Sequence, residues 1–184
     1  SRHRWRILWL VPNRLVLFLY EPCDPRFSRR MMRINRPSGT VEFCLSLFLA
    51  NRLVGNEPNE VALETTLTGA SFISKTVTVI ALTGATCDFR INEVPQAQHQ
   101  SILVAKGDHI SIGPAKQGCR SYLAVRDKFD VDSILGSRST YQPASLGGFH
   151  GRALKNGDSL SLKPAKDQKF PDNITPLSFV PSTI

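Results

Sequence analysis

The sequence predicts a mainly β fold, an antiparallel barrel or sandwich that carries one helix. After Asn59, short runs rich in β-branched and apolar residues follow one another at roughly ten-residue spacing. Pairs of residues that favour turns, most of them containing glycine, separate these runs. A helical period of apolar residues is convincing only between Thr40 and Val54. Strands repeated at this spacing, with hardly any helical period among them, are typical of antiparallel barrels and sandwiches.

The first 36 residues are strongly basic. They hold nine arginines against two acidic residues, Glu21 and Asp24, whereas the other 148 residues hold 14 basic and 13 acidic side chains. The net charge of +8 on the 184-residue chain is therefore concentrated at one end. A nucleic-acid-binding protein is expected to spread its basic residues over the folded body. The charge distribution argues against a nucleic-acid partner, and we treat residues 1–36 as an atypical basic N-terminal segment.

An apolar run at residues 5–20 resembles a signal peptide only briefly. Pro12, Asn13 and Arg14 interrupt the run, and no small-residue cleavage site follows it. A membrane span here would place Arg14 in lipid. We expect two short strands joined by a turn at Pro12-Asn13, no contact with a membrane, and a cytoplasmic location.

The stretch from Thr40 to Val54 predicts a buried helix near residues 41–54. Its apolar residues Phe43, Leu47, Ala50 and Val54 recur at three- and four-residue steps, and further leucines widen this face. Thr40 is suited to cap the N-terminus of the helix. Gly55 stands where a left-handed residue commonly ends a helix.

The strands are expected in the order of their β-rich runs. Residues 60–67 alternate apolar and polar side chains, and residues 75–82 are rich in β-branched residues. Shorter runs at residues 101–105, 109–113 and 120–125 follow, with turns at Gly107-Asp108 and Gly113-Pro114 between them. A last complete strand is expected near residues 158–163, after the turn at Gly157-Asp158.

Generic motifs do not name a reaction. The sequence has no Walker loop, no dinucleotide-binding glycine pattern, no nucleophile elbow and no H-E-x-x-H zinc motif. The four cysteines, Cys23, Cys44, Cys87 and Cys119, are widely separated and predict isolated thiols in a reduced compartment, without a metal.

One glycine-rich stretch, "ILGSRSTYQPASLGGFHGR" at residues 134–152, has two interpretations. In one, hydroxyl groups, arginines and close backbone N–H groups bind an anion. In the other, the glycines supply turns and the arginines lie on the surface. The composition of the stretch leaves both interpretations open.

The order of motifs resembles the family of the C subunit of 5-oxoprolinase, also called allophanate hydrolase subunit 2 or the biotin-dependent carboxyltransferase subdomain. The resemblance covers about residues 37–165. Its motifs in chain order are "LANRLVGN" at 49–56, "ALE" at 62–64, "IALTGA" at 80–85, "KGD" at 106–108, "IGPAKQG" at 112–118, "GCRSYLAV" at 118–125, and the series "LGSRST", "LGG", "GR" and "GD" from residue 135 to residue 158.

The resemblance implies a cyclophilin-like antiparallel β-barrel, two of which stand in tandem in family members. We expect residues 37–172 to form one carboxyltransferase-type subdomain and residues 173–184 to begin a truncated second one.

The sequence departs from the family pattern in two places. Residues 1–36 do not resemble the family's usual start, which suggests an altered or divergent start. Asp127-Lys128 stand where the family commonly has a pair of glycines, so the family pattern does not predict the local turn or a ligand contact there.

The family's chemistry acts on an amide-type carbonyl. The resemblance implies a component like the C subunit of ATP-dependent 5-oxoprolinase, which opens 5-oxoproline to glutamate, here as a truncated copy whose own activity is open. ATP would be shared with its partners, a cyclophilin-like B subunit and a further 5-oxoprolinase subunit. One alternative is the acceptor-side subdomain of a biotin-dependent urea carboxylase, with biotin as cofactor. Another is a non-catalytic regulator that binds a partner protein.

The candidate site residues follow from the glycine-rich stretch. We expect a small lactam or amide substrate, or an anion, to contact Ser137, Arg138, Ser139, Thr140 and Arg152. Gly136, Gly147 and Gly148 would support the loop. No residue is assigned as nucleophile or base.

Overall fold

The computed structural model describes residues 3–10, 15–18, 39–134 and 138–165. It has one α-helix, one short 3-10 helix and ten strands in these residues. In chain order the elements are β1 (His3–Leu10), β2 (Leu15–Phe18), α2 (Gly39–Leu53), β3 (Ala62–Thr66), β4 (Ala70–Ser74), β5 (Thr78–Ile91), β6 (Val94–Pro95), β7 (Ile102–Val104), β8 (His109–Val125), β9 (Lys128–Phe129), η1 (Gln142–Ala144) and β10 (Ser159–Lys163).

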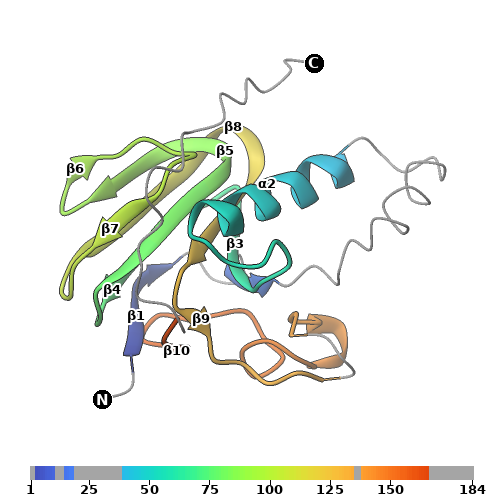
Figure 1. Ribbon diagram of the computed structural model, residues 1–184. Coiled ribbons are helices and arrows are strands. Elements are labelled where there is room, and N and C mark those ends of the chain that lie inside the picture. Colours follow the sequence, from blue (N-terminus) through green and yellow to red (C-terminus); the bar gives the residue numbers. More distant parts are fainter. Residues whose placement is uncertain (1–2, 11–14, 19–38, 135–137, 166–184) are drawn as a thin grey trace.

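The ten strands form one antiparallel sheet, which confirms the predicted mainly β class with a single α-helix. Strands β5 and β8 are its centre, because they pair along most of their length, with Leu82 opposite Leu123. One end of β8 pairs with β3 and the other with β4. The sheet continues from β4 through β1 and β10 to β9. Helix α2 lies across one side of the curved sheet, as Figure 1 shows.

Two apolar clusters hold this arrangement together. The larger one is made by residues on the inner face of the strands, including Trp5, Phe72, Leu82 and Leu123, each fully or almost fully buried. The smaller one joins α2 to the opposite face of the sheet and includes Leu47, Leu53, Val79 and Tyr122. Burying apolar area on both faces is the main favourable term for the fold.

The helix is close to its predicted position. It begins at Gly39, so Thr40 lies inside the first turn rather than at the cap. Its end follows the prediction, because Gly55 has a φ of 77° and donates its N–H to the Arg52 carbonyl, while the Asn56 N–H bonds to the Asn51 carbonyl. The helix is not buried all round, since Leu45 is 47% exposed.

The basic N-terminal segment contributes two strands in its described parts, but they do not form a hairpin with each other. Strand β1 pairs with β4 and β10, and β2 pairs with β3. Trp5 and Ile7 of β1 enter the main apolar cluster. The described parts of residues 1–36 therefore belong to the same sheet as the rest of the domain. Residues 173–184, expected to begin a second subdomain, lie outside the described residues.

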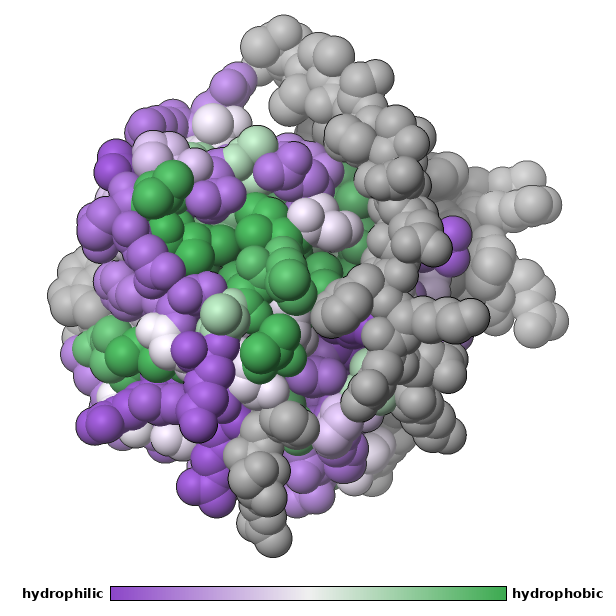
Figure 2. Space-filling view, turned by 60° about the vertical axis from the view of Figure 1, so that its left-hand side comes forward, coloured by the Kyte–Doolittle hydropathy of each residue, from purple (hydrophilic) through white to green (hydrophobic). Residues whose placement is uncertain are grey.

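Hydrophobic residues gather in the middle of the face that Figure 2 shows. Val77, Val94 and Leu103 are among the large apolar side chains that are more than half exposed. In the described part of the chain, no helix is long and apolar enough to span a membrane.

We expect Leu82→Ala to lower the free energy of unfolding by about 2–5 kcal/mol, because it leaves a cavity between β5 and β8 in the main cluster. Leu103→Ala, at a side chain that is 60% exposed, is the matched control and should change stability by less than about 0.5 kcal/mol. Urea denaturation followed by circular dichroism measures both. Equal losses in the two variants would contradict the assignment of the core.

Candidate functional site

A cavity of about 630 Å³ lies beside β10. Its walls come from three segments: the chain that leaves β9, the glycine-rich loop around Gly147 and Gly148, and the strand β10 itself. Phe129, Leu160 and Phe149 make part of the wall apolar. This size is within the range of pockets that hold small molecules.

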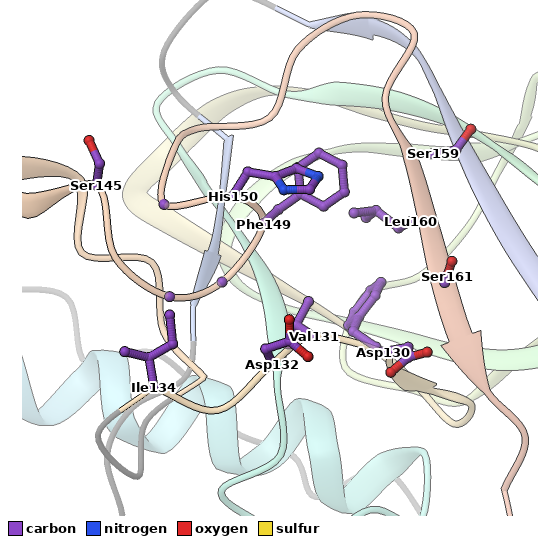
Figure 3. A pocket seen from close by; sticks show the side chains of 14 residues that line it. Asp130, Val131, Asp132, Ile134, Ser145, Phe149, His150, Ser159, Leu160 and Ser161 are labelled. Atoms are coloured by element: carbon purple, nitrogen blue, oxygen red, sulfur yellow. The ribbon is translucent and has the colours of Figure 1, made fainter.

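The polar groups of the cavity are hydroxyls, carboxylates and one imidazole. Figure 3 shows Leu160 on β10 pointing toward Phe149 and His150, with Ser159 and Ser161 before and after it in the strand. The rings of Phe149 and His150 meet edge to face, with their centroids 4.4 Å apart. Asp130 and Asp132 complete the polar lining, and Asp130 pairs with Lys163 at 2.7 Å.

No lysine or arginine is among the described residues that line the cavity. A triphosphate needs cations or a cradle of N–H groups to balance its charge. Of the two carboxylates, Asp130 is already paired with Lys163, and Asp132 would repel a triphosphate. The lining suits a small, mostly neutral molecule with an amide or hydroxyl group, and it does not fit ATP.

The glycine-rich loop reaches the cavity through a run of backbone that favours glycine. Gly147 and Gly148 have φ values of 70° and 52°. A Cβ at Gly147 would collide with the Ser139 carbonyl oxygen, and one at Gly148 with the Thr140 hydroxyl. The two glycines are therefore required because the chain at Ser139 and Thr140 passes directly behind them. The Thr140 hydroxyl is buried there, and none of the described residues forms a hydrogen bond with it.

Arg152 fixes the end of this loop. Its guanidinium donates two hydrogen bonds to the Asp158 carboxylate, at 2.8 and 3.0 Å, and one to the Ala153 carbonyl. It also lies 5.1 Å from the centre of the Phe149 ring, which lines the cavity. Burial alone would raise the pKa of Asp158, but the hydrogen bonds from Arg152 and the Lys155 N–H outweigh it, so the pKa lies below its usual value.

Arg138 fixes the start of the loop through a buried acid that the sequence reasoning did not single out. Its Nη2 atom pairs with Glu60 Oε1 at 2.6 Å, and Lys128 Nζ pairs with Glu60 Oε2 at 3.0 Å. The Glu60 side chain is only 4% exposed. Lys128 belongs to β9 and Arg138 to the loop, so one carboxylate joins two segments that flank the cavity.

Glu60 is itself held by the end of helix α2. The Asn51 side chain donates to the Glu60 carbonyl at 2.8 Å, and Asn56 donates to the Val125 carbonyl at 2.8 Å. The Val61 N–H donates to Glu60 Oε1. The "LANRLVGN" motif at residues 49–56 thus ends the helix and positions the acid that holds the loop.

A second buried acid, Glu64, lies on the sheet face that α2 covers, opposite Tyr122 on β8. Burial raises its pKa, although the Arg120 guanidinium at 3.5 Å lowers it in part. Burial also raises the pKa of the Cys87 thiol to about 11. A thiol with that pKa is protonated near neutral pH, so Cys87 is a poor nucleophile.

The structure places the predicted site residues in three groups. Gly147 and Gly148 line the cavity, while Ser139 and Thr140 lie behind those glycines. Arg138 and Arg152 are ion-paired with Glu60 and Asp158. Gly136 and Ser137 lie outside the described residues.

The sequence reasoning missed Glu60, Asp158 and most of the lining side chains. Asp158 had a usable signal, since it belongs to the "GD" that closes the glycine-rich series. Glu60 had none, because its partners are 68 or more positions away in the chain and nothing in the local pattern links them.

Comparisons with known proteins agree on one family description. The model for the carboxyltransferase domain, subdomain A and B, matches residues 36–182. Urea amidolyase of Lachancea kluyveri is 44% identical over 126 residues, which are 68% of this chain and 7% of that protein. Urea amidolyase of Saccharomyces cerevisiae is 43% identical over 151 residues, 79% of this chain and 8% of that protein.

A bacterial relative and a solved structure extend the comparison. The C subunit of Escherichia coli 5-oxoprolinase is 37% identical over 121 residues, 66% of this chain and 39% of that protein. The crystal structure of the K. lactis urea amidolyase superposes with a TM-score of 0.74 at 36% identity, covering 88% of this chain and 10% of that one. The chain thus spans well under half the length of each of these proteins.

We expect Gly148→Ala to lower the free energy of unfolding by about 2–3 kcal/mol, since the new Cβ meets Thr140 on a left-handed backbone. Gly157→Ala is the matched control: its φ is 87°, but nothing lies within 4 Å of the new Cβ. It should lose about 1 kcal/mol. Adding Thr140→Ala to Gly148→Ala should restore part of the loss. Chemical denaturation of all three variants measures this, and a Gly157→Ala loss as large as that of Gly148→Ala would refute it.

We expect Asp158→Asn to lower the free energy of unfolding at pH 7 by about 1–3 kcal/mol, because it breaks a charge-assisted pair. The folded-state pKa of Asp158 is depressed, so its contribution is present above the ordinary value of 3.8 and is lost as the pH falls through the folded-state pKa. The difference in free energy of unfolding between wild type and variant should therefore become smaller below about pH 4. Denaturation curves between pH 3 and pH 7 measure it, and a difference independent of pH would count against this role.

Proposed function

Because the chain belongs to the carboxyltransferase domain family, subdomain A and B, we propose that it is one carboxyltransferase-type subdomain that binds a small amide-type molecule in the cavity beside β10. The observation that carries the proposal is that the motifs shared with the family form and hold the cavity. The "LGG" glycines line the cavity, and "GR" and "GD" supply the ion pair that closes its loop.

We assign the subdomain first to a biotin-dependent urea carboxylase. Two urea amidolyases are 44% and 43% identical to this chain, compared with 37% for the C subunit of 5-oxoprolinase. The sequence had favoured the 5-oxoprolinase assignment, so the higher identities reverse the order of the two hypotheses. The 5-oxoprolinase assignment remains the second candidate because the match covers 39% of that relative, compared with 7% and 8% of the two urea amidolyases.

The residues of the cavity fit a ureido or lactam group. Apolar walls from Phe129 and Leu160 suit the ring, and the hydroxyls of Ser159 and Ser161 suit the polar edge. Biotin, when bound in such enzymes, supplies an activated carboxyl group. ATP would be handled by other parts of the enzyme, since the carboxylates of this lining do not suit it.

The chain's own groups could serve an acyl-type transfer in two ways. Ser159 and Ser161 line the cavity, and a serine hydroxyl can donate to an oxygen that gains negative charge, which lowers the cost of that charge. Asp132 and His150 can take up a proton from an amide nitrogen. The loop that carries His150 is held by Arg152 and Asp158, which act as positioning residues.

A pair of chimeric enzymes tests the assignment. Residues 37–165 of this chain would replace the matched segment of the S. cerevisiae urea amidolyase and, separately, that of the E. coli 5-oxoprolinase protein, produced together with its partners. We expect the first chimera to hydrolyse ATP in response to urea, and the second to respond to 5-oxoproline weakly or not at all. A folded first chimera without a urea response, beside an active second chimera, would reverse the assignment.

Single substitutions in the active chimera test the cavity. We expect Ser161→Ala to lower substrate-dependent turnover by about 10²-fold, because it removes a donor from the lining. Ser111→Ala on β8, which does not line the cavity, is the matched control and should leave turnover unchanged. Unchanged turnover in both variants would remove this cavity from the reaction.

A further inference from the structure

We propose that Lys128 and Arg138, both held by Glu60, form a binding site for the carboxylate group of a small molecule. The inference deepens the proposed function and rests on it for the choice of ligand, because it states that the substrate or its product carries a carboxylate. It concerns a cluster beside the cavity lining, since none of the three residues is among the lining residues.

The charges of this cluster do not cancel. One carboxylate, Glu60, pairs with two cations, and within the described part of the chain no second acid pairs with either of them. The excess is one positive charge. Among the described residues the neighbouring Asp127 forms no ion pair with Lys128, and its Oδ1 atom accepts the N–H of Ala165.

Exposure differs sharply between the acid and the two bases. The Glu60 side chain is 4% exposed, whereas Lys128 and Arg138 are 41% and 31% exposed. The negative charge is therefore inside and the positive charges extend from it to the surface. A ligand that approaches from solvent meets an ammonium and a guanidinium group first.

The cluster is fixed in place before a ligand arrives. Asn51 holds the Glu60 backbone, and the Val61 N–H holds Glu60 Oε1. Glu60 in turn holds both cations at 2.6 and 3.0 Å. Cations that are already ordered lose little conformational entropy on binding, which favours affinity for a small anion. A guanidinium also matches the planar, two-oxygen shape of a carboxylate.

The cavity itself would not hold this group. Its lining has no described lysine or arginine; Asp130 is already paired with Lys163, and Asp132 would repel a carboxylate placed there. Lys128 directly precedes the lining residue Phe129, and Arg138 follows the lining residue Ile134 by four positions. The cluster therefore belongs to chain segments that also line the cavity, and it offers a carboxylate the cations that the described lining lacks. Lys128 is also one of the two residues that depart from the family's glycine pair.

The test compares two lactams that differ by one carboxylate, 5-oxoproline and 2-pyrrolidinone, with acetate as a third probe. Binding to the 184-residue chain is measured by calorimetry and by shifts of backbone amide resonances. We expect 5-oxoproline to bind about tenfold more tightly than 2-pyrrolidinone, the value of one charge-assisted contact. Lys128→Met should remove most of this preference. Glu60→Gln should enlarge it, because the excess charge rises while both cations remain.

Lys116→Met is the matched control, because it removes the same charge from an exposed position on β8 and should keep the preference. The opposite effects of Lys128→Met and Glu60→Gln separate an anion site from a purely structural ion pair, since loss of a structural pair would weaken binding in both variants. If Glu60→Gln does not fold, the comparison of Lys128→Met with Lys116→Met decides alone.

Equal affinity of the wild-type chain for both lactams would overturn the carboxylate site and leave the cavity proposal standing. Acetate binding that is weakened by Lys128→Met, with neither lactam bound, would support the carboxylate site and count against the proposed function. A carboxylate preference that survives Lys128→Met unchanged would also overturn the site.

Discussion

The buried carboxylate of Glu60 is the interaction on which the site depends. A carboxylate that is 4% exposed needs hydrogen-bonding or charged partners, because the loss of its hydration costs several kcal/mol. Lys128 and Arg138 satisfy this requirement, and they come from the two chain segments that flank the cavity. The position of β9 and of the glycine-rich loop is therefore tied to the end of helix α2 by electrostatic necessity.

An ion pair also fixes the other end of the loop. There the base, Arg152, comes before its acid, Asp158, in the chain. Asp158 also accepts the Lys155 N–H at the turn before β10. Between these two ion pairs the backbone is in the left-handed region at Ser145, Gly147, Gly148, His150 and Gly151. This region is costly only for Ser145 and His150, and the ion pairs at both ends of the loop help to keep these two residues in it.

These contacts show which roles the two arginines of the glycine-rich stretch have in the fold. From composition, an arginine beside serines and glycines suggests either a ligand contact or a surface position. In the fold, Arg152 is a positioning residue, while Arg138 does two things at once, since it compensates Glu60 and retains partial exposure. The interpretation of the stretch as turns and its interpretation as a ligand site are thus compatible, because turn-forming glycines shape the cavity wall that a ligand would meet.

The sequence alone determined the parts of this protein that depend on neighbours in the chain. The period of apolar residues predicted α2, and Gly55 predicted its end, because these signals act within about ten residues. The β-rich runs predicted β3, β7 and β10 and parts of β5 and β8. They did not predict β4, β6 or β9, and the turn expected at Gly113-Pro114 lies inside the single long strand β8. The order of short motifs predicted the family. Tertiary structure alone decided that β1 joins β4 and β10, that Glu60 meets residues 68 and 78 positions later, and that β10 lies across a cavity from the glycine-rich loop. Such contacts join segments that are far apart in the chain, and the sheet brings them together only once the core has been buried.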